Sequence, residues 1–300
     1  MQEKLSTAFY DAMFGPEQLT TDMNATEQVA LDSVRNILNH PEKLSTQIPP
    51  LPTILLQLIN TLKDDNAEFS DIAEVIEKDP SLAIEVLRIA NTALYFKGDG
   101  EITSLQKAVS LIGVAGIASI SSTILLEKIR PVAPIYYRMF GKQIWIHSMQ
   151  CAFLCKALAR SEQQDEFDAY FLGLIHDIGK IIIFNCLCDA LSSGLTEGAP
   201  GTRAFKELMS EMSADISFFI AQEWALPKIY CDALQAHHHI HSDPLATLLY
   251  KGNLLSEIYL LVKKKALDDT IIDNLLVKLA VDKQIWLDFK KLCSEIESHV

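Results

Sequence analysis

The sequence predicts an all-α protein, and three observations support this. Apolar residues recur at intervals of three and four along most of the 300-residue chain, the spacing that places them on one face of a helix. Capping residues and prolines stand where helices would begin. Short β-branched runs such as residues 181–184 occur, but no stretch alternates apolar and polar residues for long enough to build a sheet.

The first segment, residues 1–45, is expected to be a helical extension, because residues 27–38 are amphipathic at helical spacing. The proline-rich residues 49–52 separate this extension from the rest of the chain. Helices from about residue 53 to 130 would then form one lobe. Helices from about residue 136 to 255 would form a second lobe, which holds most of the histidines.

Two helix starts in the first lobe follow from local signals. Asp79 and Pro80 pair an N-cap residue with proline in the first helical turn, so a helix is expected over residues 80–95. Thr103 and Gln106 match the capping-box pattern and place another helix start at residue 103.

Residues 108–126 form a run of nineteen residues without a charge, long enough for a membrane span by length alone. Gly113 stands where one helix would end and the next begin. The interval from Gly113 to Gly116 is three residues, whereas a transmembrane dimer motif has four. We therefore expect two packed core helices here and no membrane span.

The pair His176-Asp177 is the strongest functional signal, because residues 171–179 around it are otherwise apolar. A buried carboxylate is destabilising by several kcal/mol unless a cation or hydrogen bonds compensate it. An adjacent imidazole and carboxylate are ligands that a divalent metal accepts. The alternative is structural, with Asp177 capping a neighbouring helix and His176 hydrogen-bonding to the backbone.

Other histidines stand where a metal site would need them. His147 shares a helical face with apolar residues, so its side chain is expected to point inward; these residues are Ile144, Cys151, Leu154 and Leu158. Residues 224–239 predict a helix opened by Pro227, with His237 and His238 on or near the face of Tyr230, Ala233 and Leu234. At least one of these two histidines should face the core, and the uncertain helix register leaves open which one.

The order of these elements resembles the HD superfamily of metal-dependent phosphohydrolases. Three further motifs resemble the HDOD domain of bacterial signalling proteins, namely Ile48-Pro-Pro-Leu-Pro52 and the segments 76–95 and 102–113. The resemblance covers about residues 46–255. It implies an HDOD domain with an N-terminal helical lobe (46–132) and an HD-like lobe (133–255). Residues 256–300 are then expected to be C-terminal helices packed on the HD-like lobe.

The resemblance also implies a set of metal ligands. These are His147, His176, Asp177, His237 or His238, and Asn253, around a divalent ion such as Mg, Mn, Fe, Ni or Zn. Two positions depart from the family pattern. Ser213 falls where many members carry a further histidine, and Asn253 where catalytic members carry the last aspartate; both changes weaken a metal site.

Lys180 completes a His-Asp-x-Gly-Lys string like that of cyclic-dinucleotide hydrolases of the superfamily, although the Gly-Tyr-Pro tripeptide of those enzymes is absent. Its side chain would either contact phosphate or face solvent at a helix end. If no metal is bound, the charge of Asp177 is expected to be met by His176 or His147 in the protonated form.

Composition narrows the function. The net charge of −13 and the lack of clustered Lys and Arg argue against a nucleic-acid surface, and residues 263–265 are interpreted as a solvated basic helix end. The six cysteines lack a Cys-x-x-Cys pair and are expected to be reduced core thiols. No signal sequence opens the chain, so a cytoplasmic location is expected. Residues 191–202 form the longest loop signal, either a pocket cover or a surface connector.

Two functions follow. The first is a bacterial signal-transduction module of the HDOD type, with a degenerate metal site, that binds a protein partner or a small signalling ligand such as a nucleotide. The second is an active metal-dependent phosphohydrolase. In that enzyme Asp177 and Lys180 would be catalytic, with a metal-bound water as nucleophile.

Overall fold

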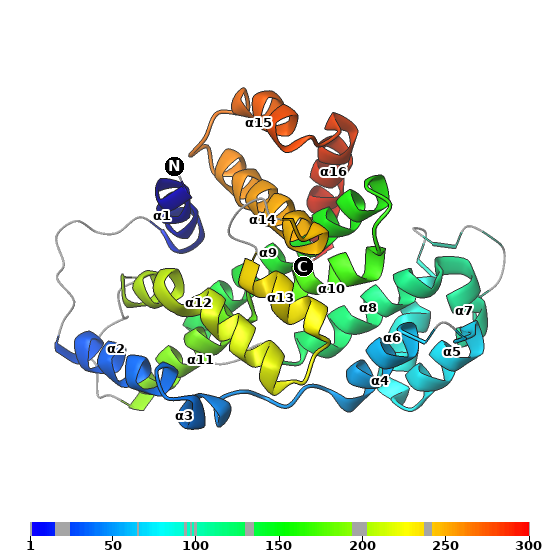
Figure 1. Ribbon diagram of the computed structural model, residues 1–300, viewed down its shortest axis with the longest axis horizontal. Helices are drawn as coiled ribbons and strands as arrows, with labels where there is room; N and C mark the ends of the chain where they lie inside the picture. The colour runs from blue at the N-terminus through cyan, green and yellow to red at the C-terminus, as the bar shows by residue number, and fades with distance from the viewer. Residues whose placement is uncertain are drawn as a thin grey trace. The chain divides into compact units, whose positions relative to one another are not determined.

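The computed structural model describes residues 2–299 apart from residues 16–24, 65, 93–94, 97, 99–100, 130–134, 194–202 and 237–241. Every regular element in this part of the chain is a helix, which confirms the all-α prediction (Figure 1). The chain divides into two compact units, one of Pro49–Arg130 and the other of Met1–Ile48 with Pro131–Val300.

The smaller unit is built from short amphipathic helices around one apolar core. In chain order they are α4 (Thr53–Leu62), α5 (Phe69–Glu77), α6 (Pro80–Ala90), α7 (Leu105–Ile112) and α8 (Val114–Glu127). The Asp79 carboxylate accepts hydrogen bonds from the backbone N–H groups of Ser81 and Leu82 at 3.0 and 3.1 Å, so Asp79 caps α6 as expected.

Two predicted boundaries in this unit were wrong. Helix α6 ends at Ala90, not at residue 95, because the Asn91 amide donates to the carbonyl oxygens of Leu87 and Ile102 and accepts from the Ile102 N–H. These bonds tie the helix end to the segment that precedes α7. The cap of α7 is Ser104, one residue after Thr103, since Ser104 has the extended backbone of an N-cap and accepts from the Lys107 N–H at 3.1 Å.

The uncharged run at residues 108–126 belongs to two helices, as predicted. They meet at Gly113, whose φ of 83° favours glycine, and they are bent by 113° there. Two other segments of the described chain are long and apolar enough to cross a membrane, Glu166–Ala190 and Pro244–Lys263. In these, 94% and 56% of the apolar window is buried inside the protein, so packing against the rest of the chain accounts for much of their apolar character.

The larger unit is organised around one long helix. Its elements are α1 (Gln2–Phe14), α2 (Ala25–Leu38), α3 (Pro41–Ser45), α9 (Ile135–Ser161), α10 (Glu166–Ile175), α11 (Ile178–Ser193), α12 (Arg203–Glu223), α13 (Lys228–Ala236), α14 (Pro244–Lys263), α15 (Ile271–Leu279) and α16 (Lys283–His299). Helix α9 packs against α10, α14 and α16, while α2 packs against α11 and α12 (Figure 1).

Two glycines allow close approach to α9, and this positions the site. A Cβ atom on Gly173 of α10 would lie 2.7 Å from the Cα of Ala152, and one on Gly252 of α14 would lie 2.5 Å from the Cys155 Sγ. Only glycine fits at such contacts. The C-terminal end of α10 and the middle of α14 are therefore held against the same stretch of α9, residues 151–155.

The terminal helices pack on this unit. Helix α1 contacts α9 and α14, and α16 contacts α9. The rings of Tyr259, Trp286 and Phe289 join α14 to α16, with centroids 5.3 to 6.2 Å apart. All six cysteines are buried thiols in the described part of the chain, as expected for the core.

Candidate metal centre

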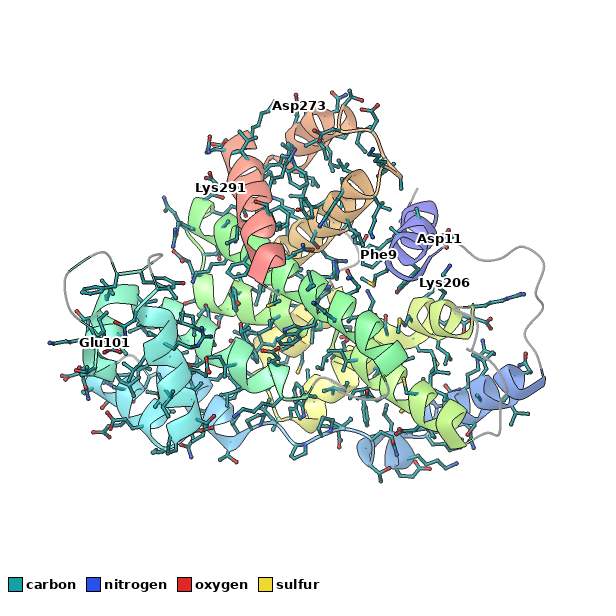
Figure 2. All side chains as sticks on the ribbon, turned by 180° about the vertical axis from the view of Figure 1, so that it is seen from behind. Phe9, Asp11, Glu101, Lys206, Asp273 and Lys291 are labelled. Carbon is teal, nitrogen blue, oxygen red and sulfur yellow. The ribbon has the colours of Figure 1, made fainter. Side chains whose placement is uncertain are left out.

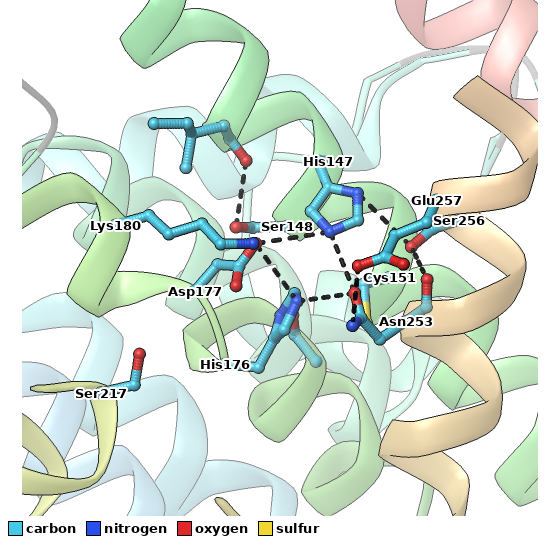
Figure 3. A network of polar contacts seen from close by, with 12 residues as sticks. His147, Ser148, Cys151, His176, Asp177, Lys180, Ser217, Asn253, Ser256 and Glu257 are labelled. Atoms are coloured by element: carbon cyan, nitrogen blue, oxygen red, sulfur yellow. Dashed lines mark hydrogen bonds and ion pairs between the residues drawn. The ribbon is translucent and has the colours of Figure 1, made fainter. Parts of the chain in front are cut away.

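Four polar side chains from three parts of the unit converge beside α9. His147 lies on α9, His176 ends α10, Asp177 stands in the turn before α11, and Asn253 lies on α14 (Figure 3). The ligand atoms of the two histidines and Asp177 all lie within 4.8 Å of one another, and these three side chains are buried. Helical spacing predicted the inward direction of His147, and the structure agrees.

The distances define one small cluster. The Asp177 Oδ2 atom lies 3.4 Å from the Nε2 atoms of both His147 and His176. The Asn253 Oδ1 atom lies 3.1 Å from the same two nitrogens. Behind Asn253, its amide Nδ2 donates to the Glu257 carboxylate at 3.2 Å, which fixes the direction of the amide oxygen.

The outer nitrogens of the imidazoles determine the tautomers. The His176 Nδ1 lies 2.8 Å from the Gly173 carbonyl oxygen, which can only accept, so this nitrogen carries the proton. The Ser256 hydroxyl donates to the backbone carbonyl oxygen of Asn253. Its oxygen lies 3.5 Å from the His147 Nδ1 and is available to accept from that nitrogen. A neutral imidazole protonated at Nδ1 presents a lone pair at Nε2.

Burial keeps both imidazoles neutral. It lowers the pKa of His147 to about 3, against the attraction of Asp177, and it also lowers the pKa of His176. Two imidazole Nε2 atoms, a carboxylate oxygen and an amide oxygen therefore face one place, and an Nε2 atom without a proton offers its lone pair there. This donor set suits a divalent cation, so the residues present fit the metal that the sequence implied.

Lys180 is the counter-charge that sequence reasoning did not find. Its Nζ atom donates to the Asp177 Oδ2 at 2.8 Å, and both side chains are buried. Burial alone would lower the pKa of Lys180, but the contact with Asp177 outweighs it and raises that pKa. Burial likewise would raise the pKa of Asp177, yet His176, Lys180 and His147 together lower it. Asp177 is thus paired with a lysine and not with a protonated histidine, and Lys180 does not face solvent.

The N-terminal helix covers the cluster, which sequence reasoning also missed. The Phe9 ring lies 4.8 Å from the His147 ring, centroid to centroid. The Lys180 Nζ lies 5.3 and 5.4 Å from the ring centroids of Phe9 and Tyr10, within the range of a cation–π contact. Phe9, Tyr10 and Met13 are all buried, and their spacing on α1 was the available signal.

An ion pair between a buried lysine and a partly exposed aspartate holds α1 in place. Lys206 of α12 donates to the Asp11 carboxylate and, at 2.8 Å, to the Gly15 carbonyl oxygen just beyond the helix (Figure 2). The Lys206 side chain is only 8% exposed. A buried ammonium without these partners would be strongly destabilising, so the pair fixes the position of α1 over the cluster.

Ser213 lies at the edge of the same region, on α12. A hydrogen bond joins its side chain to the Tyr10 hydroxyl. A Cβ atom on Gly179 would lie 2.8 Å from the Ser217 backbone nitrogen, and the Gly179 N–H donates to the Ser217 hydroxyl at 3.0 Å. The glycine of the His-Asp-x-Gly-Lys string therefore allows α11 and α12 to approach closely.

Two predicted features lie outside the described residues. His237 and His238 follow the last described residue of α13, Ala236, and their position relative to the cluster stays a prediction. The loop expected over residues 191–202 begins later than predicted, because α11 continues to Ser193; its remaining residues, 194–202, are not described either. The predicted inward face of α13 is present, since Tyr230, Ala233 and Leu234 are buried.

The fold and this cluster define a helical protein of HD type, and comparison identifies the family. The HDOD domain matches residues 48–240. The chain belongs to the HDOD domain family.

Solved structures share the fold. A proposed signal transduction protein from Marinobacter aquaeolei is 19% identical with a TM-score of 0.59, over 94% of this chain and 66% of that one. A proposed phosphohydrolase from Shewanella amazonensis is 19% identical with a TM-score of 0.57, over 90% and 94% of the two chains. An HDOD domain protein of unknown function from Geobacter sulfurreducens is 22% identical with a TM-score of 0.55, over 77% and 80%.

A sequence relative is longer than this chain. An uncharacterised protein of Treponema pallidum is 24% identical over 205 residues, which make up 66% of this chain and 39% of the relative. The matched region thus spans well under half of that relative. At these identities the likeness establishes the fold, and the activity has to be argued from the site.

Proposed function

We propose that this protein is a regulatory module of the HDOD type, which acts by binding a protein partner or a small ligand and does not hydrolyse phosphoesters. The observation that carries this proposal is the cover formed by α1. Phe9 and Tyr10 pack against His147 and Lys180, the groups that a phosphoester would have to approach. Hydrolysis needs the phosphorus atom next to an activated water, and the two aromatic rings block that approach from the side of α1.

The charge of the cluster supports the same proposal. Asp177 is the one carboxylate in direct contact with both histidines among the described residues, and Lys180 already neutralises it. Asn253 adds a neutral oxygen where an aspartate would add charge. A site with little net negative charge holds and polarises a divalent metal weakly. We therefore assign the cluster a structural role, in which it fixes the meeting point of α9, α10 and α14.

The partner is also a proposal. The net charge of −13 disfavours a nucleic acid, because phosphate backbones repel an acidic surface. A protein or small-ligand partner in the bacterial cytoplasm fits this charge and the family.

The second candidate is a metal-dependent phosphohydrolase, and a specific observation favours it. The Nε2 lone pairs of His147 and His176 and the oxygens of Asp177 and Asn253 point at one place, as ligands of Mg, Mn, Fe, Ni or Zn would. A bound metal would supply an activated water. Asp177 would hold it, and Lys180 would offset charge on the phosphate.

One experiment separates the two candidates. The full chain and a variant that lacks residues 1–15 are analysed for metal content and assayed with Mg or Mn on bis-p-nitrophenyl phosphate and cyclic dinucleotides. We expect no turnover by either protein. Turnover by the full chain that Asp177→Asn abolishes would overturn the regulatory proposal. Turnover only after removal of α1 would also overturn it, and would identify an enzyme that its own helix keeps closed.

A further inference from the structure

A pocket of about 240 Å³ lies between α9 and the C-terminal end of α14, next to the cluster, because His147 belongs to its lining. Helix α9 contributes Lys142, His147 and Gln150 to its lining, and the end of α14 contributes Lys263 and Lys264. We call it the lysine pocket.

The charge of the lysine pocket is unlike that of the whole protein. Acidic residues outnumber basic ones by 39 to 26 in the chain, yet every charged residue that lines the pocket is a lysine. Lysines at the end of a helix are common, because they face the negative end of the helix dipole. That explanation covers Lys263 and Lys264, which end α14, but not Lys142, which reaches the pocket from α9.

Gln150 provides the second observation. Its side chain is 4% exposed and lines the pocket, and the structure gives its amide no hydrogen-bond partner among the described residues. The polar groups of buried residues nearly always have a partner, so an unpartnered amide of a residue that lines a pocket indicates a site for a ligand atom or water. Next to lysines, an oxygen of an anion is the natural acceptor for its N–H groups.

We propose that the lysine pocket binds a small phosphate-bearing anion. The ammonium groups supply charge, and the amide of Gln150 supplies N–H donors. The volume lies below the range of about 300–1,000 Å³ of pockets for drug-sized ligands, so the ligand is a small organic phosphate and not an extended one. The small ligand of the proposed regulatory function would thus be an organic phosphate. Its role in regulation rests on that proposed function, whereas the binding does not.

His147 links the pocket to the cluster, because it belongs to both. An anion in the pocket lies beside a side chain that also contacts Asp177, Asn253 and Phe9 of α1. An anion bound in the lysine pocket would therefore act on a residue at the point where α1, α9 and α14 meet.

The test is a calorimetric titration of the full chain with inorganic pyrophosphate at low ionic strength, in the presence of a chelator that removes divalent metals. We expect saturable binding with one site per chain. The double variant Lys142→Glu, Lys264→Glu should raise the Kd at least tenfold. Gln150→Met, which keeps the volume and removes the amide, should raise it about fivefold.

A matched control separates a pocket from bulk charge. Lys278→Glu, Lys291→Glu makes the same change in net charge at two exposed lysines on α15 and α16 that do not line the pocket, and it should leave the Kd within twofold. Equal weakening by the control pair, an unchanged Kd in Gln150→Met, or no saturable binding by the unmodified chain would each overturn the proposal. Phosphoester hydrolysis is measured separately. If the protein binds pyrophosphate and also hydrolyses phosphoesters, only the regulatory proposal is overturned. If it shows no binding and no hydrolysis, only the lysine-pocket proposal is overturned.

Discussion

The Lys180 ammonium lies 2.8 Å from the Asp177 Oδ2 atom, and both side chains are buried beneath the first helix of the chain. This ion pair changes the meaning of the His-Asp motif. Asp177 is balanced by a cation that the chain supplies itself, three residues further on, so the cluster can be stable without a bound metal. The Asp177 carboxylate thus lies among groups arranged as metal ligands and is also paired with a cation of the chain itself.

The buried pair should show strong energetic coupling. In chelator, Lys180→Met alone and Asp177→Asn alone should each lower the free energy of unfolding by about 3 kcal/mol, since each leaves a buried partner unmatched. The double variant should lose clearly less than the sum of the two. Urea unfolding of the four proteins measures this coupling.

The exposed pair Lys228 and Asp232 on α13 serves as the control for this cycle. The two side chains are 84% and 50% exposed, so their coupling should not exceed about 0.5 kcal/mol. Additive losses at Lys180 and Asp177 would show that the two groups do not depend on each other, and the structural role of the cluster would then fail.

A second prediction concerns Glu257, which accepts a hydrogen bond from Asn253. Burial raises the pKa of Glu257 from its ordinary value of 4.5 to about 7. Between pH 4.5 and pH 7 the Glu257 carboxyl group keeps its proton in the folded protein but loses it in the unfolded chain. Above pH 7 the buried carboxylate is charged, which lowers the stability of the folded state. Glu257→Gln should therefore raise the melting temperature at pH 8.5, and this advantage should disappear near pH 5.

Thermal melts from pH 5 to 8.5 in chelator measure the effect. The control is Glu223→Gln at an exposed position of α12, for which the difference from the unmodified protein should not change with pH. If Glu257→Gln is instead less stable than the unmodified protein at every pH, the prediction is wrong. The Glu257 carboxylate would then stabilise the fold through its hydrogen bond from the Asn253 amide.

Sequence patterns predicted the parts of the site that depend on local structure. The spacing of His147 with Ile144 and Cys151 predicted its inward direction, and the apolar surroundings of His176-Asp177 predicted burial of both. Three- and four-residue periods are a property of one helix, so they are readable without a partner helix.

The remaining features depend on contacts between distant segments. The spacing of the apolar residues on α1 indicates a buried face, but not that Phe9 and Tyr10 cover Lys180, because that contact joins α1 to α11 across most of the chain. Likewise, Asn91 ends α6 through a bond to Ile102 that no local pattern encodes. Lys180 could have been recognised as a partner of Asp177 from its helical spacing of three residues, the spacing that places two side chains on one face.

The third prediction tests how α1 is held. Asp11→Lys should release α1, because it places two ammonium groups together at the buried Lys206. Hydrogen exchange of residues 7–13, followed by mass spectrometry, should then accelerate at least tenfold. The reversed pair Asp11→Lys, Lys206→Asp should restore most of the protection. Lys228→Asp on α13, which disrupts only an exposed pair, should leave exchange in α1 unchanged; if the reversed pair stays as fast as the single variant, the ion pair is not what holds the helix.

The last prediction concerns the metal itself. Asn253→Asp replaces a neutral oxygen, 3.1 Å from both imidazole Nε2 atoms, by a charged one, so the affinity for Mn should rise at least tenfold. Asn253→Leu removes the oxygen and should abolish any binding, as should His176→Ala. Calorimetric titration with Mn at pH 7.5 measures the affinities, and Gln235→Glu, at an exposed position of α13, controls for added charge.

Because Lys180 already neutralises Asp177, we expect weak binding in the unmodified chain and tighter binding in Asn253→Asp. Tight binding by the unmodified chain, with no gain from Asn253→Asp, would show that the neutral amide is a sufficient ligand and would favour the phosphohydrolase.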